Sequence, residues 1–311
     1  MFNILVTGGA GYLGSVLVPE LLSLGHRVTV LDSFIYKQSS LLDCCKYEQF
    51  EIINGDCRDE ETLKKAASGK DFIFPLAALV GFPLCDKDKT AAVSTNLNAI
   101  ETLLKVREKG QKIIFPCTNS GYGIGQGEML CTEDSPILPV SLYGKTKMAA
   151  EKAVLDAGDS VTFRFATLFG PSARMRTDLL VNDFVYRAVF DRYLVVFEGH
   201  FIRNYLHVRD AARAFIFAMN NFDVMKGQQY NCGLSNANLS KLQLCEIIKK
   251  YIPEFIYMEA PVGTDPDKRN YLVSNQKIEN VGFRPIYTLD DGIKELIKAY
   301  SIIKNSAYGN V

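Results

Sequence analysis

The glycine-rich segment TGGAGYLGS, residues 7–15, is the feature that most limits how this chain can fold. It follows the short apolar run FNILV and precedes GSVLVPELLSLG, whose apolar residues recur with helical spacing. Gly8, Gly11 and Gly14 are therefore expected in a tight turn between a strand and a helix. Such glycines allow the backbone to approach a pyrophosphate group closely, and the N–H groups at the helix start attract it. The alternative is a plain strand–helix turn that binds no ligand. Asp32, at the end of the next expected strand, makes this alternative less favoured.

That acidic residue is Asp32, which ends the second expected strand, RVTVLD. Its carboxylate can accept hydrogen bonds from the hydroxyls of an adenosine ribose. No arginine or lysine follows directly in residues 33–35, so nothing obvious would accommodate a 2′-phosphate, and NAD is favoured over NADP. Asp56, in INGDCRD after the third expected strand, is placed to meet the adenine, with a helix N-cap region as the alternative.

Strand-like and helix-like segments alternate along the first 170 residues. Strands are expected at 2–8, 27–32, 51–56, 71–78, 112–118 and 160–170, and helices at 14–25, 60–67, 90–110 and 141–158. This alternation predicts an α/β fold with a Rossmann-type, doubly wound parallel sheet, because apolar strands of this kind are buried on both faces. We expect residues 1–170 to form an NAD-binding domain, with parts of about 203–230 returning to it. Residues 171–311 would then form mainly a smaller α/β substrate domain.

Composition excludes several classes of partner. Lys plus Arg and Asp plus Glu each number 35, so no net charge points to nucleic acid or to an anionic membrane. No apolar run is as long as a membrane span, and the strand-like sequence directly after Met1 does not resemble a signal peptide. The eight cysteines are scattered and there are three histidines, so no metal site is expected. We expect a soluble cytoplasmic protein.

The segment YGKTK carries the first catalytic candidates. It puts Tyr143 and Lys147 four residues apart, on one face of an expected helix. An ammonium group beside a phenol favours the phenolate, which would shift Tyr143 towards service as a base. Such pairs also occur on ordinary surfaces, but the position of this one, after the fourth crossover of a chain that opens with TGGAGYLG, favours a catalytic role.

Taken together, these motifs resemble the extended short-chain dehydrogenases/reductases that act on nucleotide-sugars. The resemblance covers essentially the whole chain and rests on TGGAGYLG, Asp32, GDCRD, LAA (76–78), Asn96, Thr118, YGKTK, RFATLFGP, RNYLHVRD and DPDKRNYLVSNQKIENVGFRP. It implies that Tyr143 is the catalytic base, that Lys147 holds the nicotinamide ribose and tunes Tyr143, and that Thr118 hydrogen-bonds the sugar O4. It also implies NAD contacts from Tyr143 and Lys147, and from Gly8, Gly11, Tyr12, Leu13, Gly14, Asp32, Asp56, Cys57, Leu76, Ala77, Ala78 and Asn96.

Two departures from the family pattern narrow the reaction. Family members that are 4,6-dehydratases carry Asp-Glu directly after the threonine, whereas this chain has Asn119-Ser120. An amide and a hydroxyl are poor acid–base groups for water elimination, so oxidation at C4, 4-epimerisation or reduction of a 4-ketosugar remains. Thr167 stands where many relatives have an asparagine that touches the sugar diphosphate, and Asn182 is expected to substitute for it in part.

The other substrate contacts are expected mainly from arginines. Arg203 and Arg269 match family positions that bind the diphosphate, and bidentate guanidinium geometry suits that role, with surface ion pairs as the alternative. Arg176 is a further candidate, and His207 is interpreted as a structural histidine. The full expected substrate-binding set is Thr118, Asn119, Ser120, Arg174, Asn182, Arg203 and Arg269.

Four segments are closely similar to one branch of this family. They are LAALVGFPLC, CTNSGYGIG, ARMRTDLLVNDFVYRA and GTDPDKRNYLVSN, and the branch is the GDP-D-glycero-α-D-manno-heptose 4-dehydrogenases of bacterial capsule-sugar pathways. The branch implies a tightly held NAD, a GDP-sugar substrate and a 4-keto product in capsule or surface polysaccharide biosynthesis. A 4-epimerase, which shares all these residues, and a non-catalytic NAD-binding protein are the alternatives. Relatives commonly form homodimers through two helices, here expected around 92–108 and 143–155.

Overall fold

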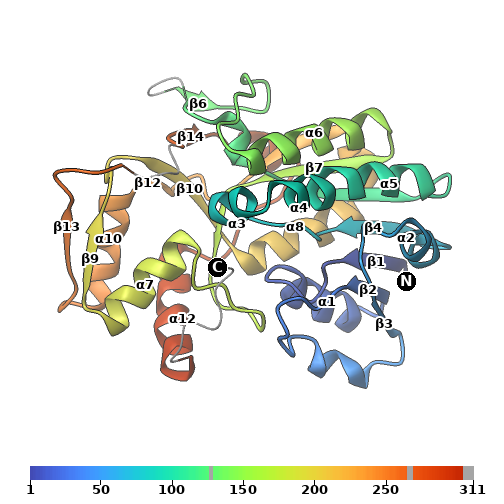
Figure 1. Ribbon diagram of the computed structural model, residues 1–311, viewed down its shortest axis with the longest axis horizontal. Coiled ribbons are helices and arrows are strands. Elements are labelled where there is room, and N and C mark those ends of the chain that lie inside the picture. Colours follow the sequence, from blue (N-terminus) through green and yellow to red (C-terminus); the bar gives the residue numbers. More distant parts are fainter. Residues whose placement is uncertain (126–128, 265–268, 304–311) are drawn as a thin grey trace.

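A seven-stranded, all-parallel sheet forms the centre of the computed structural model, which describes residues 1–125, 129–264 and 269–303 (Figure 1). The strand order is β11-β7-β5-β4-β1-β2-β3. The strands are β1 (Asn3–Thr7), β2 (Arg27–Asp32), β3 (Phe50–Asn54), β4 (Phe72–Pro75), β5 (Lys112–Thr118), β7 (Ser160–Phe165) and β11 (Gln228–Cys232). The expected Rossmann-type α/β fold is confirmed. Residues 265–268 of the DPDKRNYLVSN motif lie outside the described residues.

Helices cover both faces of this sheet, because successive side chains of a strand point to opposite faces. Ile4 and Val6 of β1 join one apolar cluster with α1 and α8, whereas Leu5, between them, joins another cluster with α2, α5 and α6. These helices are α1 (Gly14–Ser23), α2 (Glu60–Ala67), α5 (Ala99–Val106), α6 (Leu142–Asp156) and α8 (Val208–Asn220). Burial on both faces explains why the strands read as nearly continuous apolar runs.

The helix expected at 90–110 is interrupted. It is observed as α4 (Lys89–Val93), a π-helical turn at Ser94–Asn98 and α5, preceded by α3 (Phe82–Lys87). A π turn inside a helix re-aims the side chains that it contains. Here it contains Asn96, whose amide binds the loop after β4.

The single strand expected at 160–170 was wrong, because the chain changes sheets at Ala166. Up to Phe165 it pairs with β5 and β11, but β8 (Thr167–Phe169) pairs instead with β10 (Ile202–His207). β10 also pairs with β12 (Asn238–Ser240), which completes a three-stranded sheet. The apolar pattern is continuous across the break, so periodicity alone does not reveal a change of partner strand.

A third apolar cluster lies beyond this break. It is formed by α7 (Leu180–Phe190), α10 (Lys241–Tyr251) and α12 (Leu289–Ile302), together with β9 (Tyr193–Val196) and β13 (Ile256–Glu259). These elements gather on one side of the molecule, whereas α8 and β11 lie with the large sheet (Figure 1). The smaller elements are η1 (Leu42–Lys46), η3 (Asn119–Tyr122), β6 (Leu130–Cys131), α9 (Phe222–Met225), β14 (Leu272–Val273) and α11 (Gln276–Asn280). Among the described residues, no helix is long and apolar enough to cross a bilayer.

Candidate active site

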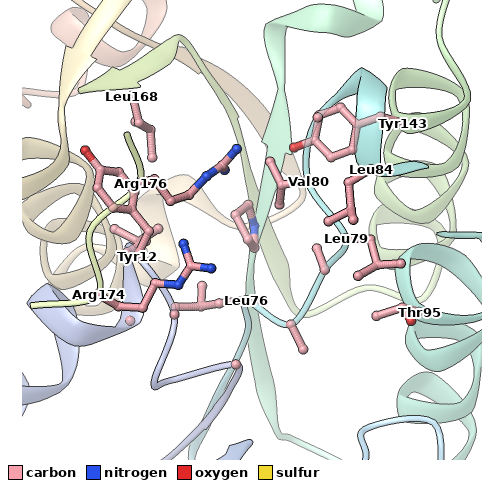
Figure 2. Close-up of a pocket in the computed structure, with 18 of the residues that line it drawn as sticks. Tyr12, Leu76, Leu79, Val80, Leu84, Thr95, Tyr143, Leu168, Arg174 and Arg176 are labelled. Carbon is pink, nitrogen blue, oxygen red and sulfur yellow. The ribbon is translucent and has the colours of Figure 1, made fainter. Parts of the chain in front are cut away.

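A cavity of about 900 Å³ opens at the carboxyl ends of the parallel strands. Its walls come from the β1–α1 loop, the loops after β2, β3, β4 and β5, the start of α6, and the segment after β8. The strand order reverses at β1 and β4, and ligands of open α/β sheets bind at such a switch point. Figure 2 shows Tyr143 entering the cavity from one side and Tyr12, Arg174 and Arg176 from the other.

The glycine loop is packed backbone to backbone, which is why it needs glycine. Gly8 has φ of +69°, and a Cβ built on it would lie 2.6 Å from Cα of Ala77. A Cβ on Gly14 would lie 2.4 Å from the carbonyl oxygen of Gly9. Among the residues that the structure describes, no side chain caps the N-terminus of α1, and the first turn of this helix contains no acidic residue. This end of α1 is therefore suited to an anion, and the loop fits the pyrophosphate of a dinucleotide.

Asp32 is held rigidly at the end of β2. One carboxylate oxygen accepts a hydrogen bond from the Ala10 N–H at 2.9 Å, and the other accepts one from the Phe34 N–H at 2.8 Å. Burial raises the pKa of Asp32, and these two hydrogen bonds act in the opposite direction. The carboxylate lines the cavity, as its predicted contact with ribose requires.

The loop after β3 brings a second carboxylate to the same end of the cavity. Asp56 makes a bidentate ion pair with Arg58, with distances of 2.9 Å from Nε and 2.5 Å from Nη2 to one carboxylate oxygen. This contact lowers the pKa of Asp56. Asp56, Arg58 and Cys57 all line the cavity.

Asn96 is close to the cavity but does not line it. Its side chain is 1% exposed, accepts a hydrogen bond from the Leu79 N–H at 2.8 Å and donates one to the Leu79 carbonyl at 2.9 Å. The loop that it holds contributes Leu76, Ala77 and Ala78 to the wall. Asn96 therefore acts on the cavity through this loop.

Tyr143 and Lys147 lie one turn apart on α6, and both line the cavity. Lys147 is 3% exposed, and its Nζ lies 4.1 Å from the centroid of the Phe115 ring. Burial lowers the pKa of Lys147 to about 8. Burial also raises the pKa of Tyr143, which differs from the expectation that the neighbouring lysine would lower it. The physical reason is that loss of solvent penalises the phenolate more than the nearby charges favour it.

Thr118 lies at the end of β5 and lines the cavity, and Ser120 holds its hydroxyl in place. Its Oγ1 accepts a hydrogen bond from the Ser120 N–H at 3.1 Å and lies 2.8 Å from Ser120 Oγ. Ser120 and Asn119 are each 1% exposed and are not part of the cavity wall. No hydrogen-bond partner of the Asn119 amide is found among the described residues.

Further cations of the cavity wall come from the chain after residue 170. Arg176, Arg203, Arg269 and Lys241 line the cavity, and Arg203 is 2% exposed. Lys241 was not predicted from the sequence. It is the first residue of α10, is 3% exposed and donates a hydrogen bond to the Phe197 carbonyl at 2.8 Å. A lysine at a helix N-terminus opposes the helix dipole, and this position is the signal that could have identified it.

Arg174 and Asn182 lie differently from the expected substrate contacts. The Arg174 guanidinium is stacked over the Tyr36 ring, on the Asp32 side of the cavity. Asn182 is fully buried outside the cavity wall and donates to the Arg176 carbonyl at 2.8 Å.

His207 is also fully buried outside the cavity wall, with Nε2 lying 3.2 Å from Glu295. Burial lowers the pKa of His207, in keeping with a structural histidine. Among the described residues, no three His, Cys, Asp or Glu side chains are grouped so as to hold a metal ion.

The fold and the cavity define a Rossmann-type dinucleotide-binding protein. The sequence profile of the NAD dependent epimerase/dehydratase family matches residues 4–233, so the chain belongs to this NAD-dependent enzyme family. It is 28% identical over 314 residues to the low-salt glycan biosynthesis protein Agl12 of Haloferax volcanii, covering 96% of this chain and 98% of that protein. It is 27% identical over 326 residues to UDP-glucose 4-epimerase of Lacticaseibacillus casei, covering 95% of each.

Solved structures share the fold along nearly the whole chain. The UDP-glucuronic acid 4-epimerase of Bacillus cereus, in complex with UDP-glucuronic acid and NAD, matches with a TM-score of 0.85 at 25% identity, covering 96% of this chain and 99% of that one. Other curated relatives are named as decarboxylases of UDP-sugars and as a dTDP-glucose 4,6-dehydratase. The relatives thus act on nucleotide-sugars by several reactions, and NAD is the cofactor of the family.

Replacement of Gly8 by alanine is expected to weaken NAD binding at least tenfold, because the new Cβ collides with the backbone of Ala77. Gly69→Ala is the matched control: Gly69 has φ of +65°, but nothing lies within 4 Å of its Cβ position. Isothermal titration calorimetry with NAD, after removal of bound cofactor, measures both. Equal affinities for the two variants would contradict the steric account.

Lys147→Met is expected to be more stable than the parent at pH 7 in the cofactor-free protein. A lysine with a folded pKa of about 8 binds its proton more weakly in the folded state. Stability should therefore be lowest below pH 8 and rise towards the unfolded pKa of about 10.4. The advantage of the variant, up to about 3 kcal/mol, should shrink over this pH range. Urea unfolding at several pH values measures it, and a pH-independent difference would contradict the burial argument.

Proposed function

We propose that this enzyme oxidises C4 of a nucleotide-linked sugar with NAD. The observation that carries the proposal is that Thr118, Tyr143 and Lys147 line one cavity together with the glycine loop and a cationic wall. A dinucleotide, a sugar hydroxyl and a diphosphate each find suitable groups there. NAD, when bound, supplies the hydride acceptor for this oxidation.

The cofactor would be held by the groups that are already preorganised. Gly8 and Gly14 provide the close backbone approach, and the N-terminus of α1 provides N–H groups for the pyrophosphate. Asp32, fixed by two backbone hydrogen bonds, would accept the ribose hydroxyls.

The proton of the C4 hydroxyl would pass to Tyr143. Thr118 would hold the same oxygen, since Ser120 keeps its hydroxyl in place at the end of β5. Burial raises the pKa of Tyr143, and the positive charges of Arg176 and Arg269 offset part of this effect. The Lys147 ammonium, buried one turn away, would hold the nicotinamide ribose.

Arg203, Arg269 and Lys241 would bind the substrate diphosphate. They line the cavity on the side formed by the chain after residue 170, so this half would supply most substrate contacts. Guanidinium and ammonium groups donate charge-assisted hydrogen bonds to phosphate oxygens.

Water elimination is disfavoured by the groups behind Thr118. Asn119 and Ser120 offer an amide and a hydroxyl where an acid–base pair would be needed, and the Ser120 hydroxyl is in contact with Thr118. A 4-epimerase would use the same residues. The similarity to a UDP-glucose 4-epimerase supports this alternative.

The substrate we propose is GDP-D-glycero-α-D-manno-heptose, on the similarity of four segments to the 4-dehydrogenases of that sugar. The test is NMR of the sugar after incubation with purified enzyme and an oxidant that regenerates NAD. A 4-keto sugar or its hydrate supports the dehydrogenase. A C4-inverted sugar identifies an epimerase, and unchanged sugar with NAD bound rejects this substrate.

Tyr143→Phe is expected to lower kcat by about 10²–10⁴-fold while NAD still binds, because only the hydroxyl that takes the proton is lost. Single-turnover absorbance at 340 nm measures hydride transfer, and calorimetry measures NAD affinity. Lys152→Met, an exposed site on the same helix, is the matched control. A Tyr143→Phe variant that turns over at the parent rate would favour the non-catalytic reading of this fold.

A further inference from the structure

The segment that follows β8 is fastened to the glycine loop at two points. The Tyr12 hydroxyl donates a hydrogen bond to the Gly170 carbonyl at 2.6 Å, and the Arg174 N–H donates one to Ser15 Oγ at 3.2 Å. All four residues are buried. The chain that leaves the large sheet therefore returns at once to the start of α1.

Arg174 lies at the end of this fastened segment and faces the cavity (Figure 2). It is 1% exposed, and its guanidinium carbon lies 3.8 Å from the centroid of the Tyr36 ring. Tyr36 belongs to the loop that follows Asp32, and the charge of Arg174 lowers the pKa of Asp32 against the effect of burial. Arg174 thus lies among the groups that would bind a dinucleotide.

Stacking on Tyr36 leaves the edges of the guanidinium as its hydrogen-bonding directions. A planar fork of N–H groups suits a phosphate in two-point contact. Arg176 enters the cavity from the same side and is paired with Asp178 at 2.6 Å (Figure 2). The buried guanidinium of Arg174 and the N-terminus of α1 together suit a pyrophosphate.

We propose that Arg174 is a cofactor-binding residue that closes over the adenosine diphosphate half of NAD, with Tyr36 as the residue that positions it. The segment 170–174 is hydrogen-bonded to Tyr12 and Ser15, so the cofactor is enclosed by this segment as well as by the glycine loop. NAD is then retained between turnovers. The inference shares its cofactor with the proposed function but does not depend on the sugar or the reaction.

The test is the rate at which NADH leaves the full-length enzyme, followed by NADH fluorescence after addition of excess NAD, without sugar. Arg174→Ala and Arg174→Gln are expected to release NADH about 10- to 100-fold faster, the effect of losing a hydrogen bond to a charged group. They should also purify with less bound NAD. Arg192→Ala, an exposed arginine paired with Glu254, is the matched control and should release NADH at the parent rate.

Variants of Tyr36 distinguish a role in positioning Arg174 from a general loss of structure. Tyr36→Leu should accelerate NADH release, whereas Tyr36→Phe should release NADH slowly because the ring remains. The double variant Tyr36→Leu, Arg174→Ala should release NADH no faster than Arg174→Ala alone. Unchanged NADH release in a folded Arg174→Gln variant would overturn the inference. Unchanged release with weakened GDP-sugar binding would also overturn it and return Arg174 to the substrate-binding role expected from the sequence.

Discussion

The contact between the glycine loop and the segment after β4 is the constraint on which the site depends. Gly8 meets the backbone of Ala77 so closely that a single added carbon would lie 2.6 Å from its Cα. Because the contact joins backbone to backbone, no rotation of a side chain can relieve it. It sets the N-terminus of α1 against the point where the strand order reverses. The N-terminus of α1 and the cavity wall formed by the loop after β4 are therefore fixed relative to each other.

Burial then decides the chemistry of the groups that line this cavity. It raises the pKa of Asp32 and of Tyr143 and lowers that of Lys147, so it opposes charge in all three. The positive charges of Arg176 and Arg269 act in the other direction on the pKa of Tyr143. A site of this kind favours ligands that bring compensating charge, and a dinucleotide and a nucleoside diphosphate both do so.

Part of this arrangement could be predicted from local pattern. The strand–glycine–helix unit, the carboxylate at the end of β2 and the shared face of Tyr143 and Lys147 all follow from spacing along a few residues. The change of sheet at Ala166 could not be predicted, since the apolar run continues through it. Nor could Asn96 or Asn182 be recognised as supports of neighbouring loops, because their backbone partners lie 17 and 6 residues away, outside the element that carries each asparagine. The raised pKa of Tyr143 depends on burial by several segments of the chain, so it cannot be predicted from the five residues of YGKTK.

The sequence by itself determined the α/β class, the alternation of strands and helices up to about residue 158, the glycine loop and the tyrosine–lysine pair, because each rests on patterns within short stretches of chain. The tertiary structure alone decided which cations share a wall and which residues stand behind Thr118. It also brought Arg174 against Tyr36, two residues 138 positions apart, through the segment pinned to Tyr12 and Ser15. The physical reason is that burial and charge are properties of the assembled cavity. They arise only when segments remote in the chain exclude water together.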